Sequence, residues 1–132
     1  MSISWENLYK VRINNPDDSF QKHEIIKLLI LMKTLNRHKN ERHYIHIYTE
    51  FLIQNQGKSK KTDLFYLNIR TKEAYSFEIQ KSLSKLWMEK TKDFYKDWNY
   101  PMTKTSDLII IPIKKLSNDI IKLNKELDEY VM

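Results

Sequence analysis

Cysteine is absent from the 132 residues of this chain, and its absence removes several classes of chemistry at once. Disulfide-stabilised folds, thiolate nucleophiles, cysteine-type zinc fingers and iron–sulfur clusters all depend on this residue. A chain without it is typical of a reducing compartment. We therefore expect an intracellular, cytoplasmic protein.

Glycine and long apolar runs are also scarce. Gly57 is the only glycine, whereas the loops that hold nucleotide phosphates need two or three, so we expect no nucleotide cofactor. The N-terminal segment MSISWENLYKVRINNPDD lacks the apolar core of a signal peptide. The longest apolar run, IIKLLILM, is interrupted by Lys27 and is too short to span a bilayer. We therefore expect no membrane association.

The residues that are present suffice for one folded domain with a basic surface. Apolar residues make up 41% of the chain and aromatic residues 12%, which is enough for a packed core. No repeat or linker interrupts the sequence, so we expect a single domain over residues 1–132. The 23 Lys and Arg exceed the 17 Asp and Glu, giving a net charge of +6. This excess favours a polyanionic partner, nucleic acid first.

The spacing of apolar residues predicts an α/β fold with the element order α-β-β-β-α-β-α. We expect a central mixed sheet of about four to five strands, flanked by helices. The predicted helices cover residues 17–37, 82–98 and 117–131, and the predicted strands cover 43–53, the two arms of a hairpin over 62–80, and 107–113.

Four finer expectations follow from the same patterns. In the first helix, one face carries the apolar residues Ile25, Leu28, Leu29, Met32 and Leu35, and we expect it to be buried. Strict alternation in the first strand places Ile45, Ile47, Thr49, Phe51 and Ile53 on one face. Residues 54–61 read as an exposed loop, and residues 107–113 as a strand buried on both faces.

Acidic residues occur where strands seldom carry them. Glu50, Asp63 and Glu78 all lie in predicted strands, and strand interiors are depleted in acids. Asp63 and Glu78 are 15 positions apart, a separation that the hairpin folds back on itself. Clustered carboxylates repel one another unless a hard cation such as Mg²⁺ lies between them. On the first helix, Glu24 interrupts an apolar line, which also calls for a reason.

These residues resemble the pattern of the PD-(D/E)XK nuclease superfamily, in particular its archaeal Holliday junction resolvase-like and viral members. The resemblance covers roughly residues 20–116. It is carried by Glu24 in KHEIIKLL, Glu50 in YTEFLI, Asp63 in KKTDLFYLN, Glu78 and Gln80 in FEIQKS, and the following helix and SDLIIIPI strand.

The resemblance implies a restriction-endonuclease-like core and a nuclease that hydrolyses DNA, including branched DNA, as a homodimer. It also implies that Asp63 and Glu78 bind Mg²⁺, which Mn²⁺ can replace, and that an activated water attacks the phosphodiester. Glu50 or Glu24 would supply a further oxygen to the metal. Gln80 would orient the water or the phosphate through its amide.

The chain departs from the family pattern at two positions. Gln80 stands where the family has lysine, and Thr62 stands where it has proline. Lys81 follows one residue late and should face the opposite side of the strand. Three readings stay open: Lys81 turns in through a bulge, Lys60 or Lys61 takes the position, or the site has lost its activity and the domain only binds nucleic acid or a protein.

Further lysines are candidates for nucleic-acid contact. Lys58, Lys60 and Lys61 cluster beside Asp63, and Lys85 belongs to a basic stripe on the predicted second helix. Trp87, Phe94 and Trp98 share another stripe of that helix, and we interpret them as core or dimer surface before base-stacking groups. An interaction protein with no nucleic-acid role ranks last, because it leaves the positive charge without a purpose.

Overall fold

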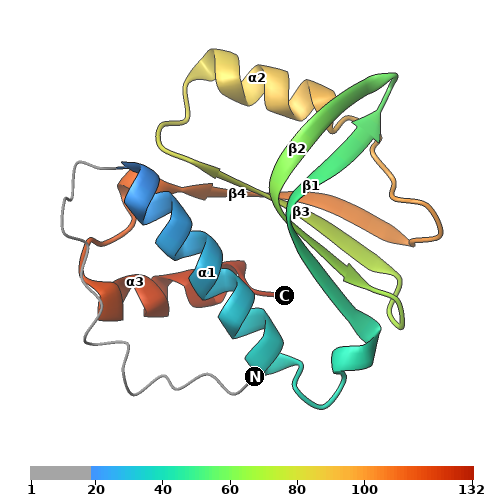
Figure 1. Ribbon diagram of the computed structural model, residues 1–132. Coiled ribbons are helices and arrows are strands. Elements are labelled where there is room, and N and C mark those ends of the chain that lie inside the picture. Colours follow the sequence, from blue (N-terminus) through green and yellow to red (C-terminus); the bar gives the residue numbers. More distant parts are fainter. Residues whose placement is uncertain (1–18) are drawn as a thin grey trace.

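The computed structural model of the protein describes residues 19–132. It contains an α/β fold with a mixed sheet (Figure 1). The elements are α1 (Ser19–Arg37), η2 (Arg42–Tyr44), β1 (Ile45–Asn55), β2 (Lys58–Asn68), β3 (Glu73–Gln80), α2 (Lys85–Phe94), β4 (Thr105–Pro112), η3 (Ile113–Lys115), α3 (Ile120–Glu126) and η4 (Leu127–Tyr130). The predicted order of helices and strands is confirmed.

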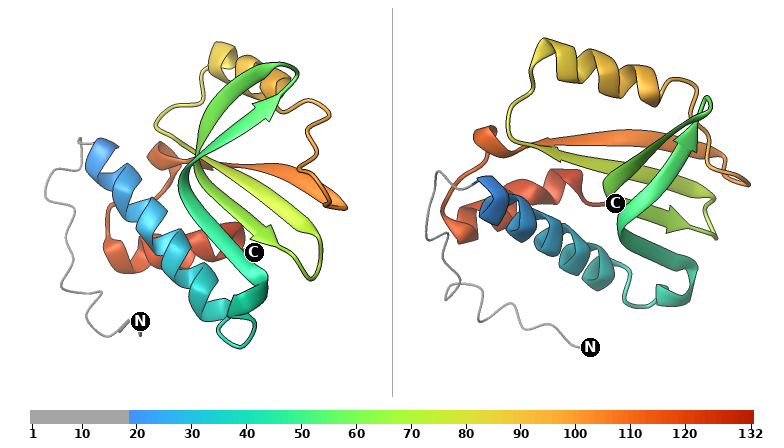
Figure 2. Two further views of the ribbon diagram at one scale, coloured as in Figure 1. Left: turned by 45° about the vertical axis from the view of Figure 1, so that its right-hand side comes forward. Right: turned by 45° about the horizontal axis from the view of Figure 1, so that its top comes forward.

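The sheet has four strands in the order β1-β2-β3-β4. β2 pairs antiparallel with both β1 and β3, and β4 runs parallel to β3. Helices α1 and α3 cover one face, while α2 covers the other, as the two views in Figure 2 show. Each face therefore has its own hydrophobic core, one under α1 and α3 and a smaller one under α2. None of the helices in residues 19–132 combines the length and apolar character needed to cross a membrane.

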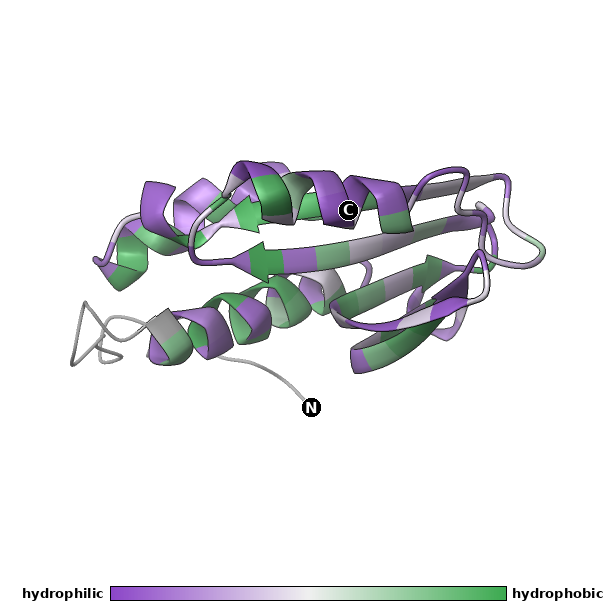
Figure 3. Ribbon diagram, turned by 90° about the horizontal axis from the view of Figure 1, so that it is seen from above, coloured by the Kyte–Doolittle hydropathy of each residue, from purple (hydrophilic) through white to green (hydrophobic). Residues whose placement is uncertain are grey.

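The face that α1 buries overlaps the predicted one only in part: Leu29 is buried as expected. Ile26 and Ile30 have no exposed surface, whereas Leu28, expected inside, is 55% exposed. The hydropathy colouring of Figure 3 shows the resulting alternation of hydrophilic and hydrophobic bands along the helix. Asp17 and Asp18, the predicted start of this helix, lie outside the described residues.

The loop predicted over residues 54–61 is wrong, because most of it is paired strand. β1 and β2 are joined by a turn at Gln56 and Gly57, whose φ angles are 53° and 75°. Two positive φ angles in succession suit the tight turns that match the twist of a β-hairpin. The pairing resumes at once, with Asn55 opposite Lys58 and Leu52 opposite Lys61.

The strict alternation predicted for β1 is also wrong, because the strand changes faces at Glu50. Its φ of 51° lies in the left-handed region, which rotates the following side chains to the other side. Ile45 and Ile47 pack in the core under α1 and α3, but Phe51 and Ile53 pack in the core under α2. Glu50 is thus the point at which β1 leaves one core for the other.

Three other features of the elements differ from the prediction. Helix α2 ends at Phe94 instead of continuing to Trp98, because Tyr95 and Trp98 turn inward and are buried in the smaller core. Strand β4 lies at an edge of the described sheet, and most of its residues are only partly buried. The last helix is divided into α3 and η4.

Candidate active-site cleft

The three predicted strand acids lie side by side across neighbouring strands. Glu50 and Asp63 fall between the pairs Thr49–Leu64 and Phe51–Thr62 of β1 and β2. Between β2 and β3, the pairing ends at Leu64 and Phe77. Asp63 and Glu78 are the next residues beyond this last pair, one on each strand. The hairpin therefore brings Asp63 next to Glu78, as its sequence spacing predicts.

Side chains replace the backbone ladder where β2 and β3 separate. Asp63 Oδ2 accepts a hydrogen bond of 2.7 Å from the backbone N–H of Ile79. Thr62 Oγ1 donates one of 2.9 Å to the carbonyl of Phe77. The first bond holds the Asp63 carboxylate at the point where the two strands separate, and the second links the strands beside it.

A cleft of about 500 Å³ lies at this point, and we call it the acid cleft. It is lined by all four predicted acids and by Gln80 and Lys81. Its polar lining consists of His23, Glu24, Glu50, Lys60, Asp63, Glu78, Gln80 and Lys81. The other predicted lysines, Lys58, Lys61 and Lys85, do not line it.

Glu78 is the most deeply buried acid of the cleft, with 7% of its side chain exposed. Burial raises the pKa of this carboxyl, and the nearby negative charge of Asp63 raises it further. Lys60 Nζ, 3.5 Å from Glu78 Oε1, and the Tyr95 hydroxyl, which donates to the same oxygen at 2.9 Å, counteract these effects. The pKa of Glu78 is therefore raised in spite of both partners.

His23 is a residue of the cleft that the sequence analysis did not identify. Its Nε2 lies 3.1 Å from Asp63 Oδ1, and its Nδ1 lies 3.3 Å from Glu24 Oε1. The hydrogen bond to Asp63 is the main reason why the pKa of His23 is raised. Its position directly before Glu24 was the one available signal, since the neighbouring carboxylate was already a candidate.

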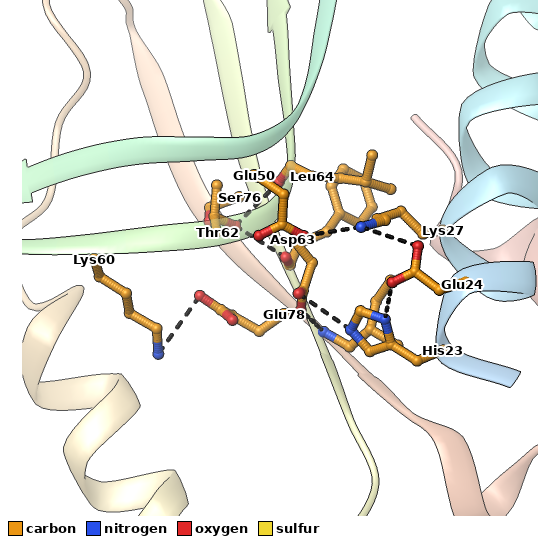
Figure 4. A network of polar contacts seen from close by, with 12 residues as sticks. His23, Glu24, Lys27, Glu50, Lys60, Thr62, Asp63, Leu64, Ser76 and Glu78 are labelled. Carbon is orange, nitrogen blue, oxygen red and sulfur yellow. Dashed lines mark hydrogen bonds and ion pairs between the residues drawn. The ribbon is translucent and has the colours of Figure 1, made fainter. Parts of the chain in front are cut away.

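Lys27 was also missed, and it connects α1 with β1. Its ammonium lies 2.8 Å from Glu50 Oε1 and 3.3 Å from Glu24 Oε2. Burial alone would lower the pKa of Lys27, but the hydrogen bonds to these two carboxylates outweigh it and the pKa is raised. Figure 4 shows His23 and Lys27 approaching the acids from α1, while Lys60 reaches Glu78 from the opposite side.

Three lysines were candidates for the position at which the resembled pattern has lysine and this chain has Gln80. Of the three lysines considered, Lys60 has its ammonium beside Glu78. Lys81 is exposed on the rim of the cleft, and Lys61 is exposed outside its lining. A positive charge is thus present at the acids, but it comes from β2 instead of β3.

The carboxylate oxygens of the cleft are the type of ligand that magnesium prefers. Mg²⁺ binds through one or two protein carboxylates and takes its other ligands from water and phosphate. Asp63 and Glu78 supply such a pair. Within residues 19–132, no three Asp, Glu or His side chains are grouped so that they could hold a metal ion. The further ligand expected from Glu24 or Glu50 therefore stays a prediction, since both are paired with Lys27.

Comparison with known proteins gives no family assignment: no protein-family model, curated protein or solved structure matches this chain.

Proposed function

We propose that this protein is a small Mg²⁺-dependent nuclease that hydrolyses DNA phosphodiester bonds and has a restriction-endonuclease-like core. The observation that supports the proposal best is the pairing of Asp63 and Glu78 in one cleft at the point where β2 and β3 separate. The sequence resemblance described above points to the same two residues. A positively charged chain also suits a polyanionic substrate.

The proposed mechanism assigns each residue a part. When bound at Asp63 and Glu78, Mg²⁺ would lower the pKa of a bound water and stabilise the charge that develops on the phosphate. The Ile79 N–H and the Tyr95 hydroxyl hold the two carboxylates in place. When Glu78 serves as a metal ligand, the Lys60 ammonium is available to bind a phosphate oxygen. Gln80 orients the water or the phosphate through its amide.

A homodimer would match this activity to branched DNA. One domain of this size offers little surface to a long duplex, whereas a two-fold pair presents two clefts to a junction of the same symmetry. The dimer and the branched substrate are part of the proposal and rest on the resemblance.

The alternative function is a nuclease-like domain that binds nucleic acid or a protein without cutting. Two observations favour it. Each acid of the cleft is already paired with a basic side chain of the protein, namely His23, Lys27 or Lys60. In addition, Gln80 lacks the charge of the usual lysine.

A cleavage assay distinguishes the two functions. The protein is incubated with linear, nicked and four-way DNA in Mg²⁺, Mn²⁺ or EDTA. We expect metal-dependent cutting that falls at least about 100-fold in Asp63→Ala and Glu78→Ala, because each change removes a predicted metal ligand. Asp107→Ala, which removes an exposed acid of β4, is the matched control and should cut normally. Binding without cutting in any metal supports the alternative, and no binding at low salt contradicts both functions.

The same assay tests the part given to Lys60. Lys60→Met should reduce cutting strongly, since the side chain keeps its length but loses its charge. Adding Gln80→Lys to that variant should restore part of the rate by returning a cation to the usual family position. Full activity of Lys60→Met would remove Lys60 from the mechanism.

A further inference from the structure

A second hollow of about 470 Å³ lies between the turn of the β1–β2 hairpin and α2. We call it the hairpin–α2 groove. Lys58, Ser59 and Lys60 line it on the strand side, and Trp87, Lys90 and Phe94 line it on the helix side. Lys60 and Trp87 also line the acid cleft, so the two hollows adjoin at these residues.

The two walls of the groove are fixed to each other. Asn55 Nδ2 donates a hydrogen bond of 2.7 Å to the carbonyl of Phe94, and Gln56 Nε2 donates one of 2.9 Å to the carbonyl of Lys96. The hairpin turn is thereby tied to the C-terminal end of α2. A groove held in this way is formed before any ligand arrives, which lowers the entropy lost on binding.

The charge of the groove is suited to an anion. Lys58, Lys60 and Lys90 line it, while Asp93 is the acid among its lining residues. Lys58 and Lys90 are exposed on opposite walls. Phosphates that follow the groove toward the acid cleft would meet a lysine on each side.

Trp87 gives the groove an aromatic surface that the core does not use. Trp98 is 7% exposed and packs in the core under α2, but Trp87 is only partly buried and lines both hollows. The Ser84 side chain accepts a hydrogen bond from the Trp87 N–H and caps the helix there. Lys60 Nζ lies 5.7 Å from the centre of the Trp87 ring, which places a cation and an aromatic face together at the boundary of the two hollows.

We infer that the hairpin–α2 groove binds an unpaired nucleic-acid strand, with a base stacked on Trp87 and phosphates paired with Lys58, Lys60 and Lys90. An aromatic ring stacks readily on an unpaired base, because the faces of a base in a duplex are covered by its neighbours. The inference rests on the proposed function in one respect: it makes the substrate a DNA with a single-stranded segment next to the cut.

Binding in EDTA tests the inference without any cutting. Fluorescence anisotropy measures the affinity for a labelled single-stranded oligothymidine and for a duplex of equal length. We expect Trp87→Ala to weaken single-strand binding about tenfold, in line with the loss of one stacked base, and to leave duplex binding nearly unchanged. Trp87→Phe keeps a ring and should retain most of the affinity. Leu86→Ala is the control, because Leu86 is 62% exposed on the same helix and does not line the groove.

The lysines provide a second, independent readout. Lys58→Gln and Lys90→Gln should each reduce the slope of log affinity against log salt by about one, the amount expected for one lost phosphate contact. Lys104→Gln, exposed near β4, should leave the slope unchanged. Unchanged single-strand affinity in Trp87→Ala, or an equal loss for both ligands, would overturn the inference. If only the proposed nuclease function is wrong, the result is different: single-strand binding still depends on Trp87, but no metal-dependent cutting is seen.

Discussion

Glu78 illustrates how a residue of a candidate site differs from one in an ordinary core. A carboxylate that is nearly buried is stabilised less by its partners than by water, which is why the pKa of Glu78 is raised. Tyr95 and Lys60 reduce this penalty without removing it. Residues kept in unfavourable surroundings are concentrated at functional sites.

The raised pKa of Glu78 predicts that a variant at this residue gains stability relative to the wild type as pH rises but loses the activity. A carboxyl group whose pKa is raised in the folded state adds to the free energy of unfolding at low pH. This contribution is lost as pH rises from the pKa of the unfolded state through the raised pKa of the folded state. Glu78→Gln does not titrate. In EDTA, we therefore expect its stability relative to wild type to increase from about pH 4 to pH 8, measured by urea unfolding, while its nuclease activity is lost.

Glu73 serves as the control with the opposite sign. A hydrogen bond from the Tyr75 hydroxyl lowers the pKa of Glu73, so its contribution is present at neutral pH and is lost as pH falls through the lowered value. Glu73→Gln should accordingly lose stability relative to wild type as pH rises. A difference in stability between Glu78→Gln and wild type that stays constant with pH would contradict the prediction and would show that Glu78 acts mainly as a hydrogen-bond acceptor for the fold.

At the scale of elements, α1 determines which side chains reach the acid cleft from the helical layer. His23, Glu24 and Lys27 can meet the sheet acids because α1 is fixed against the C-terminal segment. The Lys22 ammonium donates hydrogen bonds to the Leu116 carbonyl and to Asn118 Oδ1. Lys22 is 4% exposed, and burial lowers its pKa.

Lys22→Met tests this anchor. The replacement keeps an apolar chain of similar length but leaves the buried Leu116 carbonyl without its donor, which costs about 1–3 kcal/mol. Chemical denaturation should show this loss, whereas Lys39→Met, an exposed lysine in the turn after α1, should change stability by less than about 0.5 kcal/mol. Equal stability of the Lys22 variant and wild type would show that apolar packing alone positions α1.

The elements also show which parts of the fold a sequence can predict. The order of helices and strands followed from local periodicity, because each element carries its own apolar pattern. The reversal at Glu50 could not be predicted, since its positive φ is imposed by two cores on opposite faces of the sheet. The inward turn at Tyr95 and Trp98 has the same origin, because Trp98 fits a helical stripe but packs with Tyr95 in the smaller core beyond the end of α2.

The candidate site was predictable only where the residues themselves are unusual. Acids in strands stand out, so Asp63, Glu78 and Glu50 could be identified before their placement was known. His23 and Lys27 lie on an ordinary amphipathic helix, and their part depends on how α1 packs against the sheet. Lys60 was one of several lysines, and the paired register of β1 and β2 places it at the cleft.

On the scale of the whole molecule, charge is arranged as an acidic cleft within a basic protein. The net charge of +6 attracts polyanions from a distance, but the acids of the cleft would repel a phosphate that comes close. In the present arrangement the acids pair with the basic side chains of His23, Lys27 and Lys60. A divalent cation would supply the same compensation and release these groups to face a phosphate.

Such an exchange of cations predicts that Mg²⁺ stabilises the folded protein even in the absence of DNA. A ligand that binds only the folded state adds about 2.7 kcal/mol at a concentration 100 times its dissociation constant. We expect the melting temperature of the wild type to rise in MgCl₂ compared with NaCl of equal ionic strength. The double variant Asp63→Asn/Glu78→Gln should show no such rise, because it lacks both proposed ligands, whereas Asp107→Asn should respond like the wild type. Equal shifts in the double variant and the wild type would mean that magnesium acts elsewhere on the protein, and the metal-dependent mechanism would then lose its basis.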